Sequence, residues 1–206
     1  MARVVFLLRH VGLAPDVVGA PAGAVTEMRS EQRLHAADFW MRNPDYLADA
    51  LLDDREAGIR PDGADIARDI LSSREPEIRR LPMTKWRWGA YEDLDDVLAP
   101  LILHGLVAHR ATVRADHKVA EHAFWLMSPG VEFSDALLAA EPEVFGWYVN
   151  RAILIASVAG TTPGSSLKDR QYQRVEYAST PGMALIPPIA DDVRERLAIL
   201  DAAWAA

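Results

Sequence analysis

Residues 91–130 read YEDLDDVLAPLILHGLVAHRATVRADHKVAEHAFWLMSPG, and the first part of this stretch has the pattern of an amphipathic helix. Its apolar residues recur at intervals of three and four, the spacing that places side chains on one helical face. His104 and Gly105 end the pattern, and a glycine just past a helix tolerates the left-handed backbone that often closes one. The predicted buried face consists of Leu94, Val97, Leu98, Leu101 and Ile102.

Two strand-like segments follow this helix. Residues 106–113 (LVAHRATV) and 119–127 (VAEHAFWLM) predict strands, and the polar residues 114–118 (RADHK) predict the turn between them. Residues 128–130 (SPG) stop the second strand, and Phe133 begins another helical pattern. The predicted order is therefore helix, strand, turn, strand, helix.

This order resembles the winged helix-turn-helix superfamily. In that superfamily the last helix passes through a Gly-Leu-Val step into a two-stranded wing, and the returning strand often closes with Leu-Thr-x-x-Gly. The corresponding residues here are Gly105, Leu106 and Val107, followed by Leu126, Ser128 and Gly130. The resemblance covers residues from about 63 to 140 and implies a winged-helix domain with a small β-wing.

Pro100 departs from the helical pattern because it lies inside the predicted helix. A proline ring removes a backbone donor and clashes with the carbonyl four residues earlier. We therefore expect the helix before the wing to be kinked or split near Asp96.

The rest of the chain is predicted to be mostly helical. Residues 2–13 form a short apolar helix or strand that stops at Gly12, and residues 14–25 form a loop. A helix is expected from Thr26, as its N-cap, to the break at Asn43-Pro44. Further helices are expected after Pro44, over 63–73, over 142–159, from Ser166 and from about Asp191.

The length of 206 residues suits one core domain with a substantial extension, or two small domains. With 50% hydrophobic and 25% charged residues, the composition is that of a globular chain. The predicted organisation is N-terminal helices (1–62), a winged-helix domain (63–140) and a helical C-terminal extension (141–206).

Several classes of function are excluded or disfavoured by composition. The chain has no cysteine, so it has no disulfide, no thiolate zinc site and no cysteine nucleophile. Its net charge of −8 argues against a basic surface over the whole molecule, although a local patch is compatible with it. The N-terminal apolar run stops after five residues and no later run approaches about 20, so a cytoplasmic location and no membrane partner are expected.

DNA binding is the first functional hypothesis, because the helix before the wing enters the major groove in the winged-helix superfamily. Phosphate contacts need basic side chains, and the candidates here are Lys85, Arg87, Arg110, Arg114 and Lys118. The predicted helix instead opens with four carboxylates, which would repel phosphate; they belong to Glu92, Asp93, Asp95 and Asp96.

Protein binding is the second hypothesis, because winged helices are also reused as adaptors, for example in subunits that dock on ATP-driven machines. An acidic helix suits that use better than it suits DNA. Large rigid aromatic side chains dominate protein interfaces, and Trp86, Trp88 and Tyr91 are the candidate anchors. The alternative for these aromatic residues is that they fill the core.

A histidine phosphatase is a remote alternative. Leu7-Leu8-Arg9-His10 resembles the start of that family, whose signature is Arg-His-Gly. The resemblance implies that His10 would accept a phosphoryl group held by Arg9. Val11 replaces the glycine, and the αβ alternation that such an enzyme needs is missing downstream.

Two further motifs are interpreted as structural. Residues 160–166 (GTTPGSS) have three residues between the glycines and no following lysine, whereas a P-loop needs four and a lysine. The pairs His104/His109 and His117/His122 lack a cysteine or a well-placed carboxylate partner. We therefore expect no metal and no cofactor.

The sequence thus predicts a mainly α, cytoplasmic protein without enzymatic activity. The leading hypothesis is a winged-helix adaptor or regulatory subunit that binds a protein partner, as in an ATP-driven complex. The alternative is a winged-helix transcriptional regulator that binds DNA and forms a homodimer through helices outside the wing.

Overall fold

The computed structural model describes residues 1–16, 18–73, 75–86, 89–91, 94–113, 115 and 119–204, without the side chains of residues 76, 91 and 120. The chain forms two compact units, and each consists of two separate segments. Unit 1 is Met1–Asp38 with Glu92–Asp169, and unit 2 is Phe39–Tyr91 with Arg170–Ala206. The predicted parts 1–62, 63–140 and 141–206 are consecutive stretches of sequence, whereas the two units are defined by their compactness. The three-part division therefore stays a prediction.

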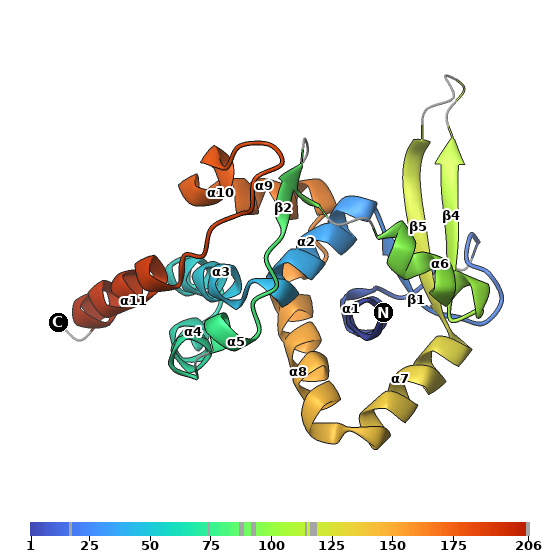
Figure 1. The fold of residues 1–206 in the computed structure, drawn as a ribbon, viewed down its shortest axis with the longest axis horizontal. Helices are drawn as coiled ribbons and strands as arrows, with labels where there is room; N and C mark the ends of the chain where they lie inside the picture. The colour runs from blue at the N-terminus through green and yellow to red at the C-terminus, as the bar shows by residue number, and fades with distance from the viewer. Residues whose placement is uncertain are drawn as a thin grey trace. The chain divides into compact units, whose positions relative to one another are not determined.

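Both units are mainly helical with small antiparallel sheets, which confirms the predicted class at that level (Figure 1). The residues of α2 and α9 are divided between the units. Unit 1 holds α1 (Ala2–Val11), β1 (Ala24–Arg29), the start of α2 (Glu31–Arg42), α6 (Asp95–Leu103), β4 (Val107–Val113), β5 (Val119–Met127), α7 (Ser128–Ala140), α8 (Pro142–Ala159) and the start of α9 (Gly164–Tyr172). Unit 2 holds α3 (Pro44–Glu56), α4 (Gly63–Ser72), α5 (Glu75–Ile78), β2 (Thr84–Trp86), β3 (Gly89–Tyr91), α10 (Val175–Ser179) and α11 (Ala190–Trp204).

The core of unit 1 forms around α1. The residues left open as helix or strand are helical, and the apolar run Val4–Leu8 is buried on every side. A helix that is apolar all round must be covered all round. The segments α7, α8, β1 and β5 pack against it, and Phe6 lies 6.3 Å from Tyr148 of α8 between ring centroids.

The predicted hairpin after α6 is confirmed, and a third strand joins it. The sheet order is β1-β5-β4 and both pairings are antiparallel. Phe124 of β5 lies opposite Met28 on one side and His109 on the other. These three side chains therefore share one face of the sheet.

The prediction of a helix from Thr26 is wrong, because residues 24–29 form β1 and α2 begins at Glu31. The Thr26 hydroxyl donates to the carbonyl of Leu8 (2.6 Å) at the end of α1 and caps no helix. Gly12 permits this approach, since a Cβ there would lie 2.3 Å from the Leu8 oxygen and 2.9 Å from the Thr26 side chain. A long-range strand partner has overridden the local capping signal.

Two other boundaries differ from their predictions. The helix that contains Pro100 is continuous over Asp95–Leu103, so the predicted split near Asp96 is wrong, while the alternative of a kink there stays a prediction. Because α6 begins at Asp95, the carbonyl that Pro100 leaves without a donor belongs to exposed Asp96 in its first turn, where water can reach it. The segment 128–130, predicted as a stop before the next helix, is itself the first turn of α7, with Pro129 near its start.

Unit 2 is organised around α3, which packs against α4, α5 and α11. Pro44 starts α3 directly after Asn43, as the predicted break requires. Three aspartates of this helix are buried: Asp45, Asp49 and Asp54. Arginine side chains neutralise the negative charge of two of them. Asp49 pairs with Arg174 (2.7 Å) and with Arg196, and Asp54 pairs with Arg170 (2.8 Å).

Among the described residues, no helix combines the length and the apolar character needed to cross a bilayer. Within the same residues, no group of three or more His, Asp or Glu side chains is placed to hold a metal ion.

Candidate functional site

The helix that precedes the β4–β5 hairpin, α6, has a buried face and an exposed face. Leu94, Leu98 and Leu101 are buried as predicted, whereas Val97 is half-buried and Ile102 is 39% exposed. The prediction that Ile102 belongs to the buried face is therefore wrong. Its side chain lines a groove beside the sheet and is not packed into the core.

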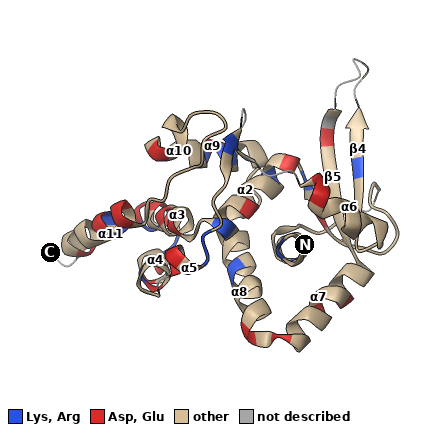
Figure 2. Cartoon of the chain, viewed as in Figure 1, with Lys and Arg blue, Asp and Glu red and all other residues tan. Residues whose placement is uncertain are grey.

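The exposed face of α6 is acidic at its start and apolar at its end. Asp95, Asp96 and Ala99 are exposed, and Leu103 is 82% exposed. The sequence of α6, DDVLAPLIL, contains no lysine or arginine, and Figure 2 shows no blue on this helix. This surface offers carboxylates and apolar side chains to whatever docks on it.

A groove of about 250 Å³ runs between α6 and the sheet. Leu94, Leu98 and Ile102 form the helix side of the groove. His109, His122 and Phe124 form the sheet side of the groove. Two acidic side chains, Glu31 and Asp95, also line it. The groove is thus mostly apolar along α6 and carries two carboxylates, Asp95 at the start of α6 and Glu31 at the start of α2.

The two histidines of the groove interact directly. His109 Nε2 lies 2.9 Å from His122 Nδ1, and the rings are stacked with centroids 5.2 Å apart. The His109 ring also stacks on Phe124 at 4.8 Å. One of the two facing nitrogens must donate and the other must accept, so this contact is incompatible with a proton on both of them.

The charges around the pair shift two pKa values. Partial burial and the neighbouring His122 lower the pKa of His109, while Asp95 and Glu31 act in the opposite direction. The pKa of Glu31 is lowered by its hydrogen bond to His35 and by His122 and His109, against a rise from burial. Glu31 is therefore an ionised carboxylate at neutral pH, 3.7 Å from His122 Nε2.

Chemically, this groove suits a side chain with an apolar stem and a cationic end. The apolar surface of α6 would cover the stem, and Glu31 and Asp95 would face the positive charge. Arginine and lysine side chains combine these two properties.

Three of the residues predicted to bind a partner or nucleic acid, Lys85, Trp86 and Tyr91, belong to unit 2 and are not among the residues that line this groove. Trp86 lies on β2 and is 44% exposed, and Tyr91 lies on β3, where its side chain is not described. Lys85 is buried, donates to the carbonyl of Ala178 and lies 5.1 Å from the centroid of the Tyr172 ring. Its ammonium therefore holds the chain segment around Ala178 in place and is not presented at the surface.

The remaining predicted nucleic-acid residues are divided. Arg110 is exposed on β4, donates to the carbonyl of Gly19 and lies 5.0 Å from the centroid of the Trp125 ring. Because side chains alternate along a strand, it is on the opposite sheet face from His109 and the groove. Four predicted binding residues lie outside the described part of the chain: Arg87, Trp88, Arg114 and Lys118.

The residues singled out for a phosphatase lie at the end of α1. Arg9 donates to Ser134 (2.5 Å) and pairs with Asp135 (2.6 Å) of α7. Burial, and then the charge of Arg9, lower the pKa of His10. Arg9 thus joins α1 to α7, which is a structural role.

Sequence reasoning missed Glu31 and the meeting of His109 with His122. The predicted helix from Thr26 contains Glu31 in its interior, whereas Glu31 is the first residue of α2. Counting back from the predicted turn pairs residue 109 with 123 and would put the two histidines on opposite faces of the hairpin. The register shift between Thr112 and Val113 pairs His109 with Phe124 and so brings both histidines onto one face.

Comparisons of the chain with protein-family models, with curated proteins and with solved structures found no match.

Proposed function

We propose that this protein is a winged-helix adaptor or regulatory subunit that binds a protein partner through α6 and the adjoining groove. The observation that carries the proposal is the chemistry of α6: its exposed side chains are acidic or apolar, and none is basic. A helix of this kind matches a protein surface with apolar and basic side chains.

The order of elements in unit 1 supports the winged-helix part of the proposal. α6 leads through Gly105 and Leu106 directly into the β4–β5 hairpin, the step that the resemblance implies for the last helix and its wing. Gly105 has φ of +68°, the left-handed conformation expected of a glycine that closes a helix. β1 pairs with the returning strand, so the hairpin is part of a three-stranded sheet.

Electrostatics disfavour docking of α6 on DNA. Each phosphate contact normally exchanges bound counterions for a lysine or an arginine, and α6 supplies neither. Asp95 and Asp96 at its first turn would instead face the phosphates. Binding DNA through this helix would therefore be opposed at every sequence, and the regulator hypothesis would have to rest on other residues.

The test is recovery of a complex from the natural host with a tagged form of this 206-residue chain. Ile102→Asp places a third charge on the docking face, and Ile153→Asp on α8 is the matched control, since the two side chains are 39% and 50% exposed. We expect a stoichiometric protein partner with the unmodified chain and with the control. Recovery should fall at least tenfold with Ile102→Asp, while circular dichroism shows both variants folded.

Equal recovery with both variants would contradict docking on α6. The same preparations are then titrated with random-sequence duplex DNA at low and at moderate salt. A complex that weakens steeply with salt would support the DNA-binding regulator instead.

A further inference from the structure

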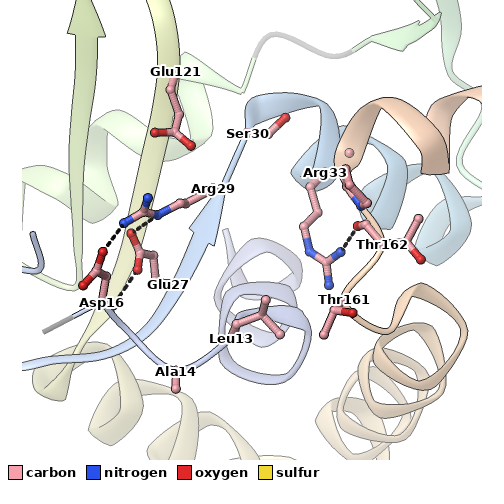
Figure 3. A pocket seen from close by; sticks show the side chains of 12 residues that line it. Leu13, Ala14, Asp16, Glu27, Arg29, Ser30, Arg33, Glu121, Thr161 and Thr162 are labelled. Atoms are coloured by element: carbon pink, nitrogen blue, oxygen red, sulfur yellow. Dashed lines mark hydrogen bonds and ion pairs between the residues drawn. The ribbon is translucent and has the colours of Figure 1, made fainter.

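A second cavity, of about 420 Å³, lies in unit 1 away from the α6 groove. Its walls come from β1, the first turn of α2 and the loop before α9 (Figure 3). That loop and the first turn of α9 together contain residues 160–166 (GTTPGSS), whose spacing does not match a P-loop. The cavity is within the usual range for a small-molecule site, about 300–1,000 Å³.

One side of the cavity is built on a buried cation, Arg33, which is 4% exposed. Its guanidinium donates to the carbonyl oxygens of Gly160 (2.6 Å) and Thr162 (2.5 Å), and more distantly to that of Val11. Its Nε has no hydrogen-bond partner among the described residues, and no described carboxylate contacts it. Burial alone lowers its pKa, with no acidic neighbour to offset the effect.

A buried charge with only neutral partners is costly to the fold. The neighbouring backbone adds to the positive character of this side, because α9 begins at Gly164 and helix N-termini carry a partial positive charge. A Cβ on Gly164 would lie 2.5 Å from the backbone nitrogen of Arg33, so the two segments are packed as closely as a glycine permits. The cost of burying Arg33 would be offset by an anionic group bound in the cavity.

The opposite side carries the reverse charge. Asp16, Glu27 and Glu121 line it, with Arg29 as the cation among them. Arg29 donates to Glu27 (2.8 Å) and to Asp16 (3.1 Å), which leaves an excess of negative charge. Figure 3 shows this group on one side and Arg33 on the other.

We propose that this cavity binds a free α-amino acid as a zwitterion. The carboxylate would lie toward Arg33 and the start of α9, and the ammonium toward the carboxylates of Glu27 and Glu121. Leu13, Ala14 and Pro163 offer an apolar wall for the side chain. A ligand with only a negative charge would be repelled by the three carboxylates, and a ligand with only a positive charge would be repelled by Arg33. The proposal does not depend on what docks on α6.

The test is calorimetric titration of the full chain with each of the twenty standard amino acids. Acetate, methylamine and inorganic phosphate serve as probes that carry only one charge type. We expect saturable binding of at least one amino acid with a Kd below about 1 mM. Acetate, methylamine and phosphate should each bind at least tenfold more weakly than that amino acid.

Variants locate the binding in the cavity. Glu121→Gln should weaken it at least threefold, whereas Glu132→Gln, the same change on exposed α7, should leave it unchanged. Arg33→Gln should abolish it, and Glu121→Gln keeps the test decisive if the Arg33 variant fails to fold. Absence of binding by all twenty amino acids, equally tight acetate or phosphate, or equal Kd values for the two glutamate variants would overturn the proposal.

Discussion

Gly130 shows how a single residue without a side chain sets the start of α7. A Cβ at this position would lie 2.3 Å from the carbonyl oxygen of Leu106 and 2.6 Å from a methyl carbon of Leu126. The glycine therefore lets α7 begin directly against the step between α6 and β4. It is also the last residue of the motif on which the winged-helix resemblance depends.

Gly130→Ala is therefore expected to destabilise the protein by about 2 kcal/mol, the cost of forcing an extra methyl group into a packed site. Gly146→Ala is the matched control, because a Cβ there meets nothing within 4 Å and the residue lies inside α8. Alanine should stabilise that helix by about 0.5 kcal/mol. Urea unfolding of both variants measures the two changes, and equal effects would contradict the close approach at residue 130.

The histidine pair of the groove makes a prediction about proton binding. Because the folded chain lowers the pKa of His109, the neutral ring is favoured by folding. The stability contributed by this group is complete above the ordinary histidine pKa and is lost as the pH falls toward the lower folded value. His122→Asn should raise the pKa of His109 without restoring it fully, since partial burial remains; Glu31→Gln should lower it further.

NMR titration of the imidazole signals measures these shifts directly. An unchanged His109 pKa in His122→Asn would show that the two rings do not interact in solution.

At the scale of elements, the sequence predicted those helices and strands whose pattern is local. The α6 helix, the β4–β5 hairpin and the break at Pro44 could be predicted because apolar spacing, Gly105 and Pro44 itself report them directly. β1 could not, because its strand character comes from pairing with β5, about a hundred residues later in the chain. The groove could not be predicted either, because Glu31 of α2 is distant in the chain from α6 and the hairpin, and the two histidines share a face only through the register shift in that hairpin.

The buried charges of α3 give a prediction at this scale. Asp49 is buried and pairs with both Arg174 and Arg196, so Asp49→Asn removes the carboxylate that faces Arg174 and one of the three that pair with Arg196. Loss of one member of such a network costs about 3 kcal/mol. Asp191→Asn is the control, because it removes an exposed pair with Arg194 and should cost less than about 1 kcal/mol.

Thermal or urea unfolding compares the two aspartate variants. Equal losses would contradict the assignment of the α3 network as a stabilising core feature.

At the scale of the whole molecule, two properties bear on function. The net charge of −8 opposes non-specific attraction to nucleic acid, and α6 has no basic side chain to reverse that locally. In addition, each compact unit combines two separate segments of the chain. Variants of the full chain are therefore the right probes, because a cut at residue 91 would divide both units.

Photo-crosslinking from position 103 in the natural host tests the central claim most directly. A photoreactive amino acid replaces Leu103, which is 82% exposed at the end of α6. In a separate control variant, the same amino acid replaces the exposed Val144 of α8. The adaptor account predicts a discrete protein adduct from position 103 that is absent from position 144 and is lost when Ile102→Asp is added. An adduct to nucleic acid at position 103, or the same adducts from both positions, would contradict it.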